Sequence, residues 1–194
     1  MAEMLEQLEP RPGERILEIG AGSGYNAALL ASLVGADGFV STVDLDADIV
    51  KAARERLGSA GYARLWTRCG DGADGDLDNS PFDAIIATVG VGDIPEAWVS
   101  QLRMGGRLIA PLALGLAQRV ITFERTAEGL QSMSVVGGEF MPFRGSSSAA
   151  FIGNLSFLGD PAIRLRTSRG HTVDSEVLVE SLKGQYIDTA LTGL

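Results

Sequence analysis

Histidine and cysteine are almost absent from this chain of 194 residues, which contains one of each, His171 and Cys69. A single cysteine excludes a disulfide within the chain, and these two side chains are too few to build a structural zinc site. The same scarcity leaves almost nothing for nucleophilic catalysis of the Ser/His or Cys/His type. We therefore predict a cytoplasmic protein that holds no metal.

Long apolar runs and basic blocks are also missing. The longest apolar stretch, residues 108–117, is interrupted by Pro111 and Gly115, and the charged N-terminus lacks the apolar core of a signal peptide. We therefore expect no membrane span. The formal charge of −9, without any cluster of Lys or Arg, also disfavours a nucleic-acid substrate.

The length and the 45% hydrophobic content predict one well-buried core with a small appendage. We place the main domain at residues 1–145. The small residues of Ser146–Ala150 then predict a linker or loop, and residues 151–194 form the appendage. Within this appendage we predict a strand at Ile163–Thr167, a turn at Ser168–Gly170 and a helix at Ser175–Leu182.

Strand and helix patterns alternate along the main domain after an N-terminal helical face of Met1, Met4, Leu5 and Leu8. Such alternation predicts an α/β fold with a doubly wound, mostly parallel sheet, closed at one edge by an antiparallel hairpin. The predicted strands are 15–19, 39–44, 64–69, 82–89, 107–111 and the hairpin strands 118–125 and 130–136, and the predicted helices are 25–34, 47–57 and a short one near 95–102.

The segment Ile16–Tyr25 is the most informative, because a buried strand runs into a glycine turn and then into a helix. Dinucleotide sites usually show Gly-x-Gly-x-x-Gly, with the pyrophosphate at the helix N-terminus. The tighter Gly20-Ala21-Gly22-Ser23-Gly24 found here, preceded by Glu18, better suits S-adenosylmethionine, which has an ammonium group and no phosphate. Glu18 would favour that positive end of the cofactor or brace the glycine turn.

Two further acids follow the next two predicted strands. Asp44 can accept both ribose hydroxyls, Leu45 can pack on the adenine face, and Asp71-Gly72 can reach the adenine amino group. Each signal alone is weak, because glycines serve ordinary turns and an acid at a strand end is often only a cap. Their coincidence at the ends of three successive strands, where ligands bind in such folds, favours a cofactor site.

Seven motifs form an ordered set within residues 4–145, namely Met4–Leu8, Pro12–Gly20, Gly24-Tyr25, Gly70–Gly72, Pro81–Ile86, Gly105–Leu108 and Met141–Gly145. As a set, they resemble the motifs of the protein-L-isoaspartate (D-aspartate) O-methyltransferases. The segments Gly24–Leu30, Thr42-Val43-Asp44 and Asp93-Ile94-Pro95 resemble more closely a branch associated with ribosomal peptide natural-product clusters.

This resemblance implies a Rossmann-like, seven-stranded class I methyltransferase that uses S-adenosylmethionine, with S-adenosylhomocysteine as product. We expect Thr88-Val89-Gly90-Val91 to wall the methyl site with small groups. The segment Met141-Pro142-Phe143-Arg144 would lie over the cofactor and the substrate backbone, where Arg144 pairs with an acidic substrate or is a solvated loop arginine. The family serine near the transferred methyl belongs to a segment that we expect upstream of Met1.

A carboxylate substrate would explain why so few catalytic side chains suffice. With a pKa near 4 it is already ionised at neutral pH, so the protein needs only to align two reactants and exclude water. We therefore expect direct methyl transfer to an aspartyl or isoaspartyl carboxylate of a protein or peptide. The alternatives are a cofactor-binding core without turnover, and a small-molecule methyltransferase, which would leave the Met141–Gly145 motif unexplained.

Overall fold

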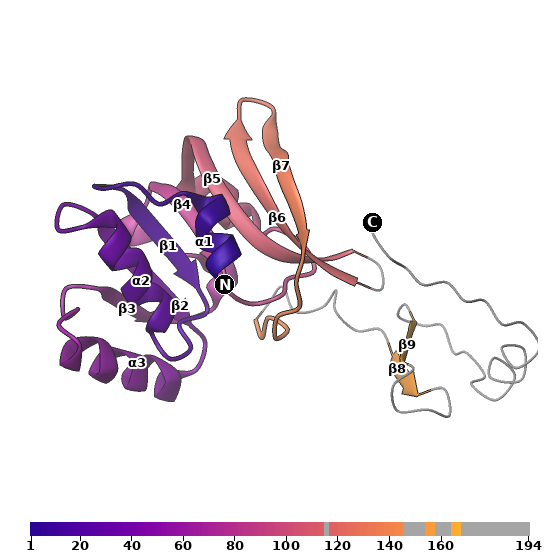
Figure 1. The fold of residues 1–194 in the computed structure, drawn as a ribbon, viewed down its shortest axis with the longest axis horizontal. Helices are drawn as coiled ribbons and strands as arrows, with labels where there is room; N and C mark the ends of the chain where they lie inside the picture. Colours follow the sequence, from indigo (N-terminus) through magenta and orange to yellow (C-terminus); the bar gives the residue numbers. More distant parts are fainter. Residues whose placement is uncertain (115–116, 146–153, 158–163, 168–194) are drawn as a thin grey trace, which may run out of the picture. The chain divides into compact units, whose positions relative to one another are not determined.

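A computed structural model describes residues 1–114, 117–145, 154–157 and 164–167 of the chain. The chain divides into two compact units, Met1–Phe151 and Ile152–Leu194, and each is described by itself. The first unit contains a seven-stranded sheet with the order β3-β2-β1-β4-β5-β6-β7 (Figure 1). Its strands are β1 (Arg15–Ile19), β2 (Phe39–Asp44), β3 (Trp66–Cys69), β4 (Phe82–Ala87), β5 (Leu102–Leu114), β6 (Ala117–Thr126) and β7 (Gly129–Gly137).

Strands β1 to β5 run parallel, and β6 and β7 form the antiparallel hairpin that the sequence predicts at one edge. Because β1 pairs with β2 on one side and with β4 on the other, the direction of chain winding reverses at β1. In open α/β sheets ligands bind at such a switch point, beyond the carboxyl ends of the strands. The fold is therefore the predicted doubly wound, mostly parallel α/β sheet.

Helices cover both faces of the sheet. The α-helices are α1 (Ala2–Leu8), α2 (Tyr25–Val34), α3 (Ala47–Ser59) and α4 (Glu96–Gln101), and two short 3₁₀ turns, η1 (Gly72–Asp74) and η2 (Leu77–Asn79), follow β3. Met4 of α1 and Leu30 of α2 pack with Ile16 in one buried cluster. Trp98 of α4 packs with Leu17 in a second cluster. Successive β1 side chains point to opposite faces, so one strand serves both cores.

The central strands follow the sequence closely, because their nearly continuous apolar runs are typical of strands buried on both faces. β1, β2 and α2 have the predicted bounds, α3 extends two residues further, and β4 ends at Ala87 instead of Val89. β3 begins at Trp66 instead of Arg64, because Leu65 N–H bonds back to the Tyr62 carbonyl in a turn.

The largest difference in the sheet concerns β5, which was predicted at 107–111 and spans Leu102–Leu114. Phe82 pairs with Leu102 but Ala84 pairs with Arg107, so β5 carries extra residues at this point. Gly105, with φ of 71°, lies in this bulge. The two adjacent glycines lie at an irregularity inside the strand.

In the second unit the structure describes two antiparallel strands, β8 (Asn154–Phe157) and β9 (Arg164–Thr167). β9 corresponds to the predicted strand 163–167, whereas β8 was not predicted. The predicted linker 146–150, turn 168–170 and helix 175–182 lie outside the described residues.

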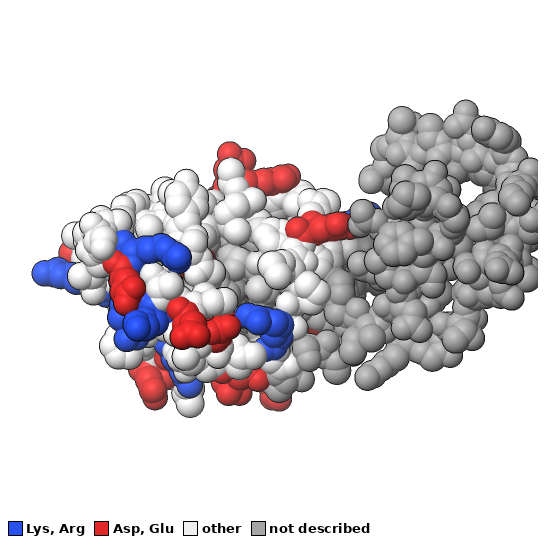
Figure 2. Space-filling view, turned by 90° about the horizontal axis from the view of Figure 1, so that it is seen from below, with Lys and Arg blue, Asp and Glu red and all other residues white. Residues whose placement is uncertain are grey.

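None of the described helices is long and apolar enough to cross a membrane. On the face drawn in Figure 2, Lys and Arg side chains of the described residues are interspersed with Asp and Glu side chains. This mixed charge on the drawn face agrees with the absence of a basic block in the sequence.

Candidate functional site

The glycine turn between β1 and α2 forms one side of the site. Gly20 has a φ of 100°, and a Cβ at this position would lie 2.7 Å from Thr88 Oγ1. The Thr88 hydroxyl donates to the Gly20 carbonyl at 2.8 Å, so it closes the turn from the end of β4. Only glycine combines this backbone conformation with so close an approach. Gly24, at the start of α2, lies against Leu57 of α3.

Asp44 lies at the carboxyl end of β2 and faces the same turn. Its Oδ2 accepts from the Gly22 amide at 3.2 Å, and its Oδ1 accepts from the Asp46 amide at 3.3 Å. Two carboxylate oxygens have about four acceptor positions, so capacity remains for further donors. Leu45 beside it is 48% exposed, which leaves an apolar surface at the rim of the site.

The third predicted element, Asp71-Gly72, follows β3. Asp71 Oδ1 accepts from the Ala73 amide at 2.9 Å and caps η1. Gly72 is packed so closely that a Cβ would lie 2.7 Å from Ile19 and 3.0 Å from Phe143. The Trp98 indole donates to the Gly72 carbonyl at 2.7 Å, so α4 fixes this turn against the end of β1.

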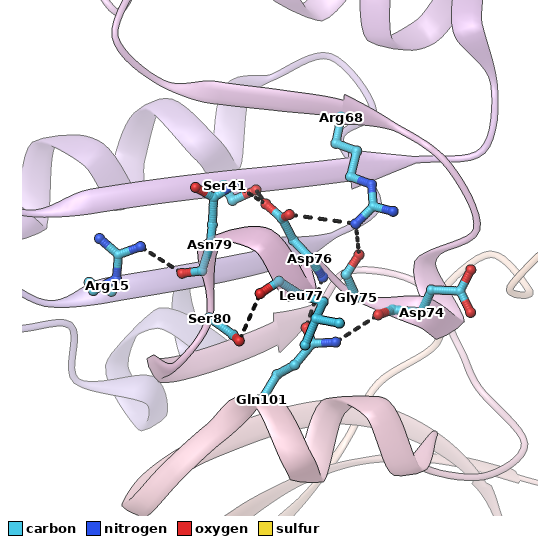
Figure 3. Close-up of polar contacts among 10 residues, drawn as sticks. All are labelled: Arg15, Ser41, Arg68, Asp74, Gly75, Asp76, Leu77, Asn79, Ser80 and Gln101. Carbon is cyan, nitrogen blue, oxygen red and sulfur yellow. Dashed lines mark hydrogen bonds and ion pairs between the residues drawn. The ribbon is translucent and has the colours of Figure 1, made fainter.

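A buried polar network holds the rest of this loop (Figure 3). Asp76 is 1% exposed, and its Oδ2 accepts from the Ser41 hydroxyl at 2.6 Å and from the Asn79 side-chain Nδ2 at 2.8 Å. Arg68 pairs with the other carboxylate oxygen at 3.5 Å. Gln101 accepts from the Asp76 amide and donates to the Asp74 carbonyl. Side chains of β2, β3 and α4 thus fix the loop that carries Gly72.

Residues Phe140–Arg144, which we call the strap, form the opposite wall. The Gly90 amide donates to the Met141 carbonyl, and the Phe143 amide donates to the Gly90 carbonyl, both at 2.8 Å. Phe143 is 7% exposed, whereas Met141 is 79% exposed and Arg144 is also exposed. The strap therefore buries the Phe143 ring and presents Met141 and Arg144 outward.

A pocket with about 390 Å³ of empty space, open solvent included, lies where the turn, the β2 end, the Gly72 loop and the strap meet. Eight of the predicted residues line it, namely Gly20, Asp44, Leu45, Gly72, Val89, Pro142, Phe143 and Arg144.

The other predicted residues do not line this pocket: Glu18, Ala21, Gly22, Ser23, Gly24, Asp71, Thr88, Gly90 and Met141. Two lining residues, Ile19 and Val43, were not predicted. Ile19 is the last residue of β1, and Val43 is the penultimate residue of β2. Their place at the strand ends could have indicated from the sequence that they line the site.

Glu18 is fully buried in β1 and has no exposure toward the pocket. Its two oxygens accept from the Asn26 side-chain Nδ2 at 2.8 Å and from the Thr42 hydroxyl at 2.6 Å. Burial raises the pKa of Glu18 to about 7, against the opposing effect of these hydrogen bonds. The sequence predicted that Glu18 either favours the positive end of the cofactor or braces the glycine turn. Its observed contacts are those of a brace, because they connect β1 with β2 and α2. Contact with the cofactor stays a prediction.

Gly22 allows a direct test of whether the turn faces a ligand. A Cβ at Gly22 has no atom within 4 Å, but its φ is 50°, a left-handed conformation that asparagine tolerates. Gly22→Asn is therefore expected to leave the thermal midpoint nearly unchanged and to weaken S-adenosylhomocysteine binding by at least about fivefold, through collision with the ligand. Calorimetric titration checks this, and an unchanged dissociation constant would mean that the Gly22 position points away from the ligand.

Comparison with known proteins yields one consistent relationship. Residues 1–147 match the family model of protein-L-isoaspartate (D-aspartate) O-methyltransferase. The chain is 41% identical over 130 residues to a protein-L-isoaspartate O-methyltransferase of Methanopyrus kandleri, covering 66% of this chain and 58% of the relative. It is 40% identical over 145 residues to one of Desulfosudis oleivorans, covering 75% of this chain and 64% of the relative.

A solved structure described as a protein-L-isoaspartate O-methyltransferase superposes with a TM-score of 0.69 and 34% identity. The superposition covers 76% of this chain and 47% of that one. The chain thus spans about three fifths of the length of these two curated relatives. The matched region contains the whole seven-stranded sheet and the pocket, and the chain belongs to the protein-L-isoaspartate (D-aspartate) O-methyltransferase family.

Proposed function

We propose that this chain binds S-adenosylmethionine in the pocket at the ends of β1 and β2 and serves methyl transfer to a side-chain carboxylate of a protein or peptide. The observation that carries the proposal is the convergence of Gly20, Asp44, Gly72 and the strap on one pocket at the switch point of the sheet. Family membership and the names of the relatives support the same cofactor and reaction.

The residues present fit the cofactor by their chemistry. Gly20 and Gly72 line the pocket, and each is packed so closely against its protein neighbours that no Cβ would fit. Asp44 supplies carboxylate oxygens for two ribose hydroxyls, and Leu45 supplies an exposed apolar surface for adenine. Phe143 and Val89 line the remaining wall with apolar groups.

When bound, S-adenosylmethionine would supply a methyl group on a sulfonium: a substrate carboxylate oxygen would bond to the methyl carbon as the methyl–sulfur bond breaks, which gives a methyl ester and a neutral thioether as the leaving group. The chain's own contribution is binding, alignment and exclusion of water. The strap brings Arg144 to the pocket wall, where its guanidinium can pair with an acidic substrate. None of these roles requires a general base, because the carboxylate is already ionised at neutral pH.

One assay separates the versions of this proposal. The full chain is incubated with S-adenosylmethionine labelled on its methyl group and with an isoaspartyl peptide, a matched aspartyl peptide or a precursor peptide from a natural-product cluster. Label on the isoaspartyl peptide alone indicates repair of damaged protein, and label on the precursor indicates biosynthetic modification. We expect the isoaspartyl peptide to be labelled, in agreement with the names of the relatives.

A cofactor-binding core without turnover is the second candidate, and the partial coverage of the relatives favours testing it. Calorimetric titration with S-adenosylhomocysteine distinguishes the two. Micromolar affinity without methyl transfer to any of the three peptides supports the second candidate. If the chain neither binds the nucleoside nor transfers label, both candidates are wrong.

A further inference from the structure

The path of the chain after β7 poses a structural problem. β7 is the edge strand of the sheet, and β6 and β5 separate it from β4, which ends at Ala87, three residues before Gly90. The strap must therefore cross from the edge to the centre of the sheet before it can pair with Gly90. Between the end of β7 at Gly137 and the bridge of Gly90 with Pro142, the chain has left its ladder with β6.

Gln118, at the beginning of β6, bridges this gap with its side chain. Its Nε2 donates to the Phe140 carbonyl at 3.0 Å, and its Oε1 accepts from the Phe140 amide at 2.6 Å. The side-chain amide thus offers Phe140 the same donor and acceptor pair that a neighbouring strand would offer. Gln118 is 4% exposed, so both bonds form away from water, where leaving a backbone group unpaired is costly.

The same amide lies against Gly90. A Cβ on Gly90 would lie 2.2 Å from Gln118 Nε2, and Gly90 does not have a positive φ that would by itself require glycine. Gly90 in turn pairs with the strap on both sides, through its amide to Met141 and through its carbonyl to Phe143. Gln118, Gly90 and Phe140 therefore form one contact unit at the start of the strap.

We propose that Gln118 is a positioning residue whose side-chain amide replaces a missing strand for Phe140 and thereby holds the strap against Gly90 at the wall of the pocket. The inference rests on the proposed function, because it assigns the strap a role in forming the cofactor pocket. Gln118 does not line the pocket and acts through Pro142, Phe143 and Arg144, which do.

Gln118→Met in the full chain keeps the length of the side chain and removes both hydrogen bonds. Hydrogen exchange of the ligand-free protein is expected to show faster exchange of the Phe140 and Phe143 amides. The dissociation constant for S-adenosylhomocysteine is expected to rise about 3- to 10-fold, the usual effect of losing hydrogen bonds. The matched control is Gln131→Met on exposed β7, which is expected to change neither quantity.

Gly90→Ala provides a second route to the same result, because its methyl group must displace the Gln118 amide. It is expected to increase amide exchange in the strap as Gln118→Met does. In the double variant the two effects are expected to be much less than additive, as for residues that act through one contact. Additive effects would show that the two residues do not act as a unit.

The outcomes separate this inference from the proposed function. If the unmodified chain does not bind S-adenosylhomocysteine, the proposed function is wrong, and the role of Gln118 in the cofactor site is wrong with it. If the unmodified chain binds and Gln118→Met binds equally well, only the inference is overturned, whatever the change in thermal midpoint. Unchanged exchange of the strap amides in Gln118→Met would overturn it equally.

Discussion

The free energy of unfolding is expected to fall as the pH rises from about 5 to about 8, and Glu18→Gln is expected to remove most of that fall. Burial raises the pKa of Glu18 from 4.5 to about 7 in the folded chain, whereas the unfolded chain has the ordinary value. Between pH 4.5 and about pH 7, the Glu18 carboxyl therefore keeps its proton in the folded state and has lost it in the unfolded state. Folding stability from this group is therefore present at acid pH and is lost by about pH 7, an effect of about 3 kcal/mol.

The surroundings of Glu18 accept a neutral group. Asn26 Oδ1 is buried and has no hydrogen-bond partner among the described residues. Rotation of the Asn26 side-chain amide brings Oδ1 to the place of Nδ2, where a protonated carboxyl or a glutamine amide can donate to it. The Thr42 hydroxyl can likewise turn to accept or to donate. Glutamine therefore fits the site at every pH, which is why it is expected to flatten the profile.

Urea unfolding measured at several pH values between about 5 and 8 checks this expectation. Glu55→Gln, the same substitution at an exposed position of α3, is the matched control and should retain the slope of the unmodified chain. If Glu18→Gln also retains that slope, Glu18 does not carry the raised pKa. When the free energies of unfolding of the variants are compared at the same pH, the contributions of the other acidic residues cancel.

The parts of the fold that sequence alone predicted are those that local pattern determines. The apolar run of Ile16–Ile19 and the glycines after it define a buried strand and a turn without reference to the rest of the chain. Asp44 was also predictable, since the end of a parallel strand has a known place in such a sheet. Eight predicted residues accordingly meet at one pocket.

The parts that sequence did not predict depend on pairing between distant segments. Gln118 has the sequence context of any polar strand residue, and its bonds to Phe140 exist only because the chain recrosses β6. Asp76 lies in a polar loop typical of solvent-exposed turns, yet it is buried by Ser41, Arg68 and Gln101. The bulge at Gly105 likewise follows from the register of β4 on β5. The residues next to each of these positions in the sequence therefore do not indicate any of these contacts.

Asp44→Ala is expected to weaken S-adenosylhomocysteine binding by about 5- to 150-fold, which corresponds to the loss of about 1–3 kcal/mol for polar groups left without a partner. Two effects of this substitution both weaken binding. The ribose hydroxyls lose their acceptor, and the Gly22 and Asp46 amides lose the carboxylate that holds them at 3.2 and 3.3 Å. The turn that faces the ligand is thereby loosened as well.

Asp44→Asn separates these consequences, because one side-chain oxygen remains to accept from the Gly22 amide while the charge and the second acceptor are lost. Its dissociation constant is expected to lie between those of the unmodified chain and Asp44→Ala. Asp37→Ala removes a carboxylate from the exposed turn before β2, at the other end of the same strand, and is the matched control for net charge. Calorimetric titration of the unmodified chain and these three variants with S-adenosylhomocysteine, at one salt concentration, measures the four dissociation constants. Equal affinity of Asp44→Ala and Asp37→Ala would show that the nucleoside does not contact the end of β2, and the cofactor site would then have to lie elsewhere on the sheet.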